Sequence, residues 1–218
     1  MELYYFPLGR HSQKVLIALY EKQVNFFPRV TDLRIPGVRE NYLTHYPHGK
    51  LPLLCASDGH VLPESSIIID YLDNSVDSGT RLLPINHNLE LQVRLFDRLI
   101  DNDLNLPLSQ LDSEQEFAVH QPQPLQLRRI ERQLQEFLME LDNQLANHHW
   151  ICGDGFTLAD CALLPCLRHP WVHQQLTELT HLSRYQHQGN LRGSWSLVLE
   201  ELELAELEEE QSLPDRSG

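Results

Sequence analysis

The first 75 residues alternate short apolar segments with polar turns, in a pattern that predicts a small α/β unit. Strands are predicted where apolar or aromatic residues run together, and helices where they recur every three or four positions. The strands are expected at residues 2–6, 25–30, 53–55 and 60–62, and the helices at residues 12–22, 36–44 and 65–72. This β-α-β-α-β-β-α order predicts a mixed sheet, in which a β-α-β unit supplies a parallel pair and a hairpin adds antiparallel strands.

The rest of the chain follows helical spacing. Residues 76–86 carry Asn, Gly and Pro among polar residues, which is typical of a linker. Beyond them, helices are predicted at residues 89–111, 125–146, 158–167 and 171–182, with a polar loop at 112–124 and a last amphipathic helix that contains Trp195. We therefore predict an α/β domain at residues 1–75, an all-α domain at 87–210 and a polar tail at 211–218.

Composition narrows the class of protein. The formal net charge of −14 argues against nonspecific nucleic-acid binding, and no apolar run approaches the ~20 residues that a membrane helix needs. No secretory signal is evident, and the four cysteines form neither a disulfide framework nor a Cys-x-x-Cys motif. The twelve histidines show no metal-ligand spacing. We expect a cytoplasmic protein that binds no metal, nucleic acid or membrane.

The most informative segment is Glu64-Ser65, which follows a short apolar strand and opens a predicted helix. Unpaired backbone N–H groups and a hydroxyl at a helix N-terminus suit a carboxylate, and Glu64 offers a counter-charge for an amine. The pair therefore matches the head group of an amino acid. The alternative is an ordinary capped helix.

A second segment places Lys50, Leu51 and Pro52 at the head of an apolar strand. Proline cannot donate to a β-ladder, so this position predicts a sheet edge or a special turn. If the Leu51–Pro52 bond is cis, the backbone groups of Leu51 would face outward and pair with a peptide ligand.

Together these features resemble the glutathione-binding half of cytosolic glutathione transferases, which combine a thioredoxin-like N-terminal domain with an all-helical C-terminal domain. The resemblance implies that Pro52 is cis, that Leu51 pairs with the cysteinyl part of glutathione, and that Glu64 and Ser65 hold its γ-glutamyl end. Lys50, or less favourably His48, would meet the glycyl carboxylate, although a surface charge is the alternative for Lys50. The absence of Cys-x-x-Cys excludes the dithiol exchange of thioredoxin itself.

In the helical region, Thr157 and Asp160 have the spacing of a capping box. The run from Phe156 to Asp160 also resembles the capping motif in the helical domain of the same family. We expect these two residues to stabilise the fold rather than to bind substrate, and the loss of such a cap costs on the order of 1 kcal/mol or more.

The family activates the glutathione thiol with a Tyr, Ser or Cys just after the first strand. Residues 4–15 resemble its Ser-x-x-Ser-x-x-Val pattern, but the first and usually catalytic Ser falls on Gly9, while the second is Ser12. Three outcomes follow: Ser12 reaches the thiol, a backbone N–H near Arg10 or His11 does so, or the site binds glutathione weakly and catalyses little.

The catalytic candidates are accordingly Ser12 and His11. Ser12 has an alternative role as the N-cap of the first helix, and His11 has one as an exposed loop residue. The outward-facing member of the pair Tyr4 and Tyr5 is a weaker candidate donor.

The resemblance implies a homodimeric detoxification enzyme that conjugates the thiol of glutathione, its co-substrate, to a small electrophile. We expect the electrophile pocket between the domains, near residues 89–111. The rival hypothesis is a non-catalytic interaction or regulatory protein on the same fold, as in stringent-starvation proteins. Gly9 and the acidic run at residues 200–210 favour that rival.

Overall fold

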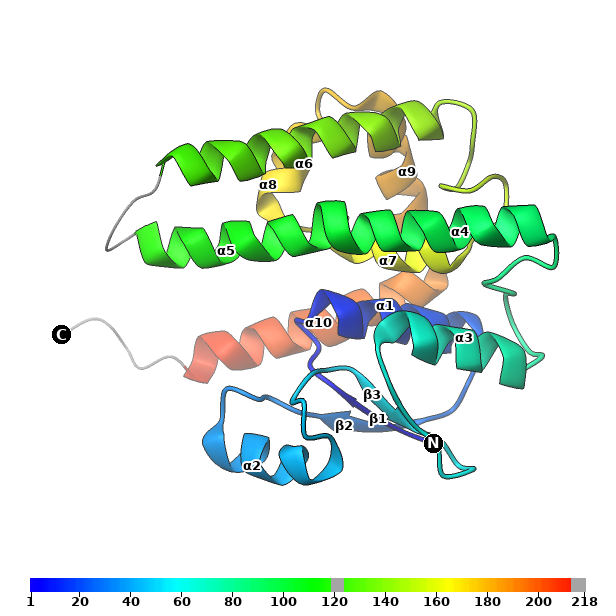
Figure 1. The fold of residues 1–218 in the computed structure, drawn as a ribbon, viewed down its shortest axis with the longest axis vertical. Coiled ribbons are helices and arrows are strands. Elements are labelled where there is room, and N and C mark those ends of the chain that lie inside the picture. Colours follow the sequence, from blue (N-terminus) through cyan, green and yellow to red (C-terminus); the bar gives the residue numbers. More distant parts are fainter. Residues whose placement is uncertain (119–123, 213–218) are drawn as a thin grey trace. The chain divides into compact units, whose positions relative to one another are not determined.

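The computed structural model describes residues 1–118 and 124–212, and the chain divides into two compact units (Figure 1). The first unit contains Met1–Arg81 together with the segment from Arg192 onward, and the second contains Leu82–Leu191. Chain order alone predicts that the segment from Arg192 belongs to the helical domain, whereas it packs with the first unit. Most of the predicted tail, residues 213–218, lies outside the described residues.

A four-stranded mixed sheet in the order β2-β1-β3-β4 forms the centre of the first unit. Its strands are β1 (Glu2–Tyr5), β2 (Phe27–Val30), β3 (Leu53–Cys55) and β4 (Val61–Pro63). β1 runs parallel to β2, and β3 is antiparallel to both β1 and β4. The predicted thioredoxin-like sheet is therefore confirmed, with strand ends shifted by one or two residues.

Helices α1 (Arg10–Glu21), α2 (Pro36–His45), α3 (Ser65–Ser75) and α10 (Gly193–Ser212) complete the first unit. The apolar face of α1 explains its formation, because Val15, Leu16 and Leu19 are fully buried. The prediction that Ser12 caps this helix is wrong, since the N-cap is Gly9 and Ser12 lies within the first turn. The sequence pattern missed this because Gly9 carries no capping side chain.

The described residues of the second unit form helices joined by loops, with no strand among them beyond an isolated bridge between Trp150 and Gly153. It contains α4 (His87–Leu99), the π-helical segment η1 (Ile100–Asn105), α5 (Leu106–Ala118), α6 (Pro124–Leu145), α7 (Leu158–Leu167), α8 (Pro170–Gln175) and α9 (Thr180–Asn190). The predicted α/β domain followed by a helical region is thus confirmed. No helix among the described residues is long and apolar enough to cross a membrane.

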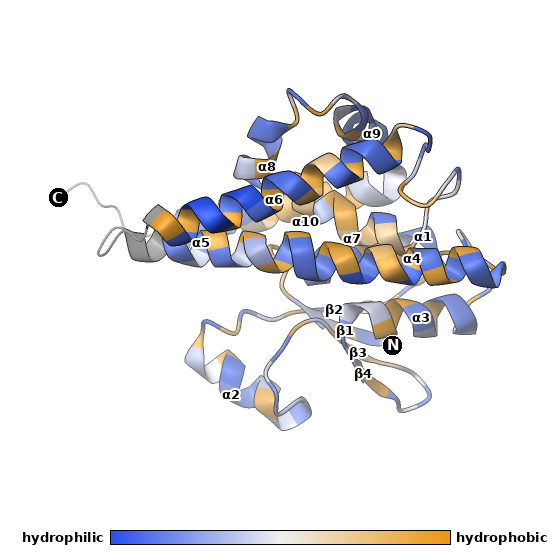
Figure 2. Cartoon of the chain, turned by 45° about the horizontal axis from the view of Figure 1, so that its top comes forward, coloured by the Kyte–Doolittle hydropathy of each residue, from blue (hydrophilic) through white to orange (hydrophobic). Residues whose placement is uncertain are grey.

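Two predictions about this unit are wrong. Most of the expected loop at residues 112–124 is helical, because α5 continues to Ala118. Residues 119–123 lie outside the described part of the chain. The single helix expected at 171–182 is two helices, α8 and α9, separated by a short turn. The long α6 follows its amphipathic pattern, visible as alternating hydrophilic and hydrophobic bands in Figure 2.

Helix α7 is buried along its whole length and begins with the predicted cap. Thr157 is its N-cap and forms a capping box with Asp160. The Asp160 carboxylate accepts hydrogen bonds from the N–H of Ile151 and the hydroxyl of Tyr185, each at 3.0 Å, as well as from Thr157. Burial raises the pKa of the Asp160 carboxyl to about 6, although these hydrogen bonds oppose the rise.

Candidate functional site

The register of the sheet brings the predicted site residues to one edge. Leu53 lies opposite Pro63 on β4 and opposite Tyr4 on β1. The residue before Leu53 and the residue after Pro63 therefore meet at the same end of the sheet, close to where β1 leads into α1. Pro52, Glu64 and the start of α1 are accordingly neighbours, although they are far apart in the sequence.

The Leu51–Pro52 peptide bond is cis, as the resemblance implied. Pro52 is buried directly before β3, Leu51 is half-buried, and the side chain of Lys50 is exposed. The Tyr42 hydroxyl donates to the carbonyl oxygen of Lys50 at 2.6 Å and so stabilises the turn that precedes Pro52. Burial raises the pKa of Tyr42, so this hydroxyl keeps its proton at neutral pH.

Glu64 holds an unusual backbone conformation at the start of α3. Its φ of 69° and ψ of 118° lie outside the regions that side-chain-bearing residues normally occupy. Such a conformation costs on the order of 1–3 kcal/mol and is concentrated at ligand sites. The side chain of Glu64 is exposed, whereas Ser65 is only 5% exposed at the first position of the helix.

Two contacts tie the starts of α1 and α3 together. Nδ1 of His11 lies 3.4 Å from Oγ of Ser65. One turn further along, Nζ of the buried Lys14 donates to Oγ of Ser66 at 3.0 Å. The structure therefore places the exposed His11 against the Glu64-Ser65 pair. Lys14 is not among the residues predicted from the sequence, where its only signal is a charged residue within the apolar face of α1.

Ser12 occupies a different environment from His11. Its side chain is only 2% exposed, and its Oγ accepts a hydrogen bond from the N–H of Phe6 at 3.2 Å. The hydroxyl thus holds the turn between β1 and α1. Direct contact between Ser12 and a thiol would require this turn to move, which favours the outcome in which the backbone at the start of α1 serves the thiol.

The two tyrosines of β1 point to opposite faces of the sheet. The hydroxyl of Tyr5, which is 3% exposed, donates to Glu201 at 2.8 Å, and its pKa is raised by burial and then by this carboxylate. Tyr4 packs against Tyr42 and His45 in tilted arrangements, with ring centroids 5.8 and 5.3 Å apart. Tyr5 is therefore engaged with Glu201.

No group of three or more potential metal ligands occurs in the part of the chain that the structure describes. The side chains gathered at the sheet edge are instead hydrogen-bonding and charged groups, which suit an organic ligand with amine and carboxylate ends.

Comparison with protein-family models agrees with this geometry. A model described as "Glutathione S-transferase, N-terminal domain" matches residues 3–79, and one described as "Glutathione S-transferase, C-terminal domain" matches residues 124–172. Glutathione S-transferase F10 of Arabidopsis thaliana is 30% identical over 203 residues, covering 89% of this chain and 94% of that protein. The chain belongs to the glutathione S-transferase family.

Other relatives of this transferase-family chain differ in the role that their names state. Glutathione S-transferase GstA of Escherichia coli O157:H7 is 29% identical over 191 residues, covering 85% of this chain and 90% of that protein. A stringent starvation protein A homolog of Coxiella burnetii is also 29% identical, over 206 residues and 93% of both chains. Sequence identity therefore does not separate the two kinds of relative.

Solved structures confirm the fold. Glutathione S-transferase 1-6 from Anopheles dirus species B superposes with a TM-score of 0.86 at 18% identity, covering 98% of this chain and all of that one. A glutathione S-transferase from Methylobacillus flagellatus KT, solved with glutathione bound, has a TM-score of 0.76 at 22% identity and covers 90% and 98% of the two chains.

Proposed function

We propose that this chain binds glutathione at the sheet edge and conjugates its thiol to a small electrophile. The observation that carries the proposal is the convergence of the cis-Pro52 turn, the strained Glu64 and the start of α1 at one end of the sheet. Likeness to a transferase structure that holds glutathione supports the choice of ligand.

Each part of glutathione has a matching group at this edge. The backbone of Leu51 would pair with the cysteinyl unit, in the manner of an added strand. Ser65 and the N-terminal end of α3 would hold the γ-glutamyl carboxylate, with Glu64 as the partner of its ammonium. Lys50, which is exposed beside the turn, would attract the glycyl carboxylate.

The chemistry requires the glutathione thiol as a thiolate. A free thiol has a pKa of about 8.5, and a helix N-terminus or a hydrogen-bond donor lowers it. The positive end of α1 and His11 are the groups that the structure offers, while Ser12 stays a candidate if the turn moves. The thiolate then attacks an electrophilic carbon, a C–S bond forms, the leaving group departs with its electron pair, and the thiol proton passes to solvent.

A second candidate function is a non-catalytic interaction or regulatory protein. Gly9 favours it, because this residue supplies no hydroxyl at the position where the family usually has one. The likeness to a stringent starvation protein A homolog over 93% of both chains points the same way.

Family likeness also supports a homodimer that acts in cytoplasmic detoxification, and light scattering of the purified protein would test the dimer.

Retention on immobilised glutathione, followed by an aryl-chloride conjugation assay, separates the two functions. We expect retention and turnover by the wild-type protein, and loss of both in Ser65→Ala. Ser75→Ala is the matched control, because it makes the same change at the far end of the same helix, where the side chain is exposed. Retention without turnover would favour the regulatory protein, and no binding at millimolar glutathione would exclude the transferase.

A further inference from the structure

A cavity of about 430 Å³ lies within the first unit and is lined in part by the turn that follows β1. Three segments line it: residues 5–8, the end of β2 with the loop toward α2, and the last turns of α10. The volume falls in the range of small-molecule sites. None of residues 89–111, where the sequence predicts the electrophile pocket, lines this cavity.

Part of the lining is apolar and open to solvent. Val30, Ile35 and Leu204 are 62%, 51% and 64% exposed, and Phe6 adds an aromatic ring. Exposed apolar side chains around a concave surface favour a ligand with an apolar body, since its binding would remove their surface from water.

The charged part of the lining is strongly negative. Asp32, Glu201, Glu208 and Glu209 contribute four carboxylates, and Arg34 is the one guanidinium among the described lining residues. A concave surface with an excess of one charge attracts ligands of the opposite charge and repels those of the same charge. The cavity is therefore complementary to a cation.

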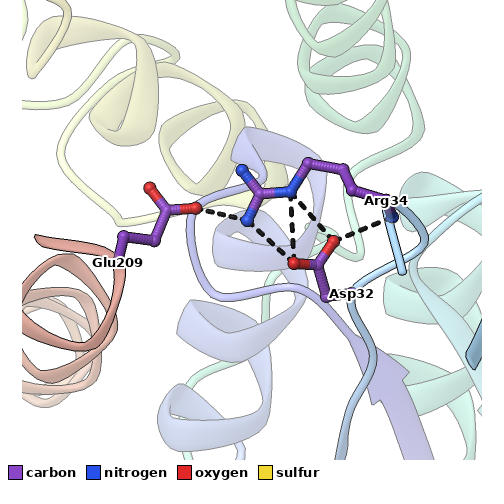
Figure 3. Close-up of polar contacts among 3 residues, drawn as sticks. All are labelled: Asp32, Arg34 and Glu209. Atoms are coloured by element: carbon purple, nitrogen blue, oxygen red, sulfur yellow. Dashed lines mark hydrogen bonds and ion pairs between the residues drawn. The ribbon is translucent and has the colours of Figure 1, made fainter. Parts of the chain in front are cut away.

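Arg34 shows how the cavity holds a cation (Figure 3). Its guanidinium donates to both carboxylate oxygens of Asp32, with the shortest contacts at 2.9 Å, and also pairs with Glu209 on α10. Its central carbon lies 4.8 Å from the centroid of the Phe6 ring, within cation–π distance. The Arg34 side chain is 62% exposed, so solvent surrounds much of this cation, which belongs to the chain itself.

We propose that this cavity binds the electrophile and selects compounds that combine an apolar body with a positive charge. The ligand's identity as an electrophile rests on the proposed function, whereas the preference for a cation rests on the lining alone. The turn from Phe6 to Gly9 connects the cavity to the start of α1, because the Gly9 N–H donates to the Phe6 carbonyl at 3.0 Å. A ligand in the cavity would thus contact the same turn that leads into α1, where the proposed function places the thiol.

Three naphthalene derivatives of similar size test the charge preference by calorimetry without glutathione, at physiological salt. The probes are trimethyl(naphthylmethyl)ammonium, naphthalenemethanol and naphthalenesulfonate. We expect the cation to bind at least tenfold more tightly than the anion, with the neutral compound between them, and this ratio to fall as salt is raised. Equal affinities, an anion preference or no binding of the cation would overturn the proposal.

Three variants locate the binding in this cavity. Glu208→Gln should weaken cation binding about threefold to tenfold, because it removes an exposed carboxylate from the lining. Arg34→Gln should strengthen it by a similar factor, since the competing guanidinium is removed. Glu203→Gln, an exposed change on the same helix outside the cavity, should have no effect. Equal effects of Glu208→Gln and Glu203→Gln would overturn the proposal.

A separate glutathione titration distinguishes this inference from the proposed function. Glutathione binding without cation preference would remove the inference and leave the function standing. Cation preference that depends on Glu208, without any glutathione binding, would support the cavity's selectivity and remove the transferase.

Discussion

At Gly9 the backbone has φ of −81° and ψ of 120°, a conformation open to every L residue. A Cβ there would lie 3.3 Å from the carbonyl oxygen of Phe6 and 3.5 Å from Oγ of Ser12, so a small side chain fits after a slight adjustment. The glycine is therefore not required by the turn, and its main consequence is the missing hydroxyl.

We predict that Gly9→Ser raises kcat/KM for an aryl chloride about tenfold at pH 7. A hydroxyl donor would lower the thiol pKa by about one unit and so increase the thiolate fraction. The gain should disappear above about pH 9, where the thiol ionises without help. Gly9→Ala is the matched control, and equal rates for the serine and alanine variants would show that the hydroxyl does not reach the thiol.

Ser12→Ala should affect stability more than catalysis. The substitution leaves the partly buried N–H of Phe6 without its acceptor, which costs about 1–2 kcal/mol in the free energy of unfolding. We expect turnover per folded molecule to stay within about twofold of wild type, measured by urea unfolding and the conjugation assay. A rise in the thiol pKa of bound glutathione would instead identify Ser12 as the thiol donor.

For individual residues, the sequence predicted which residue types lie near the ligand but not the conformation of their backbone. The proline turn was predictable because proline cannot donate to the ladder. The positive φ of Glu64 was not predictable, because only glycine commonly adopts such a conformation and nothing in the sequence indicates it for a glutamate. The contact between Lys14 and Ser66 also needed the packing of α1 against α3.

Among the elements, those with strong periodicity and a recognisable cap were predicted best. Helix α7 matches its predicted range, and α6 differs from its own by one residue at each end. The end of α5 was missed because residues 112–116 are all polar in the sequence, so the local pattern resembles that of a loop. The strong chain breaker there is the proline pair at 122 and 124, and Pro124 begins α6.

Asp160, at the start of α7, makes the free energy of unfolding depend on pH. Its carboxyl pKa is raised from 3.8 to about 6 by burial, so the native state binds this proton more tightly than the unfolded state. The stability contributed by Asp160 is therefore greatest below about pH 4 and declines as pH rises through 6. Relative to Asp160→Asn, the wild-type protein should lose on the order of 2–3 kcal/mol between pH 4 and pH 7.

Urea unfolding of both proteins across this pH range checks the prediction. A stability difference that stays constant, or that grows in favour of the wild type as pH rises, would mean that the four donors around Asp160 outweigh its burial.

In the whole molecule, the feature that chain order did not show is the place of α10. This helix packs in the first unit, where Glu201 accepts hydrogen bonds from Tyr5 and Tyr20. Its start is fixed by Glu21, which pairs with Arg192 at 2.6 and 2.7 Å and accepts from Ser194. An amphipathic pattern shows that one face of a helix is buried, but it does not show which element covers that face.

Removal of the Arg192 side chain should weaken the packing of α10 in the first unit and lower the free energy of unfolding. Burial raises the pKa of Glu21, but hydrogen bonds from Arg192 and Ser194 outweigh it and leave that pKa lowered. The stabilisation is therefore present at neutral pH and lost as pH falls below about 4.5. Arg192→Met should cost about 2 kcal/mol at pH 7, less than a fully buried pair because Arg192 is partly exposed.

The double variant Glu21→Gln with Arg192→Met tests the origin of this loss. It should recover part of the unfolding free energy, because no uncompensated carboxylate remains in the interior. No recovery would show that Arg192 acts through packing rather than through its pairing with Glu21.

The central claim is that the Glu64-Ser65 pair recognises the γ-glutamyl end of glutathione. Calorimetric titration of the wild-type protein with glutathione and with cysteinylglycine, which lacks that end, tests it most directly. We predict that glutathione binds at least tenfold more tightly, because the lost contacts are charge-assisted hydrogen bonds worth about 1.5–3 kcal/mol each. Equal affinity for the two peptides, or no binding of glutathione at millimolar concentration, would contradict the account.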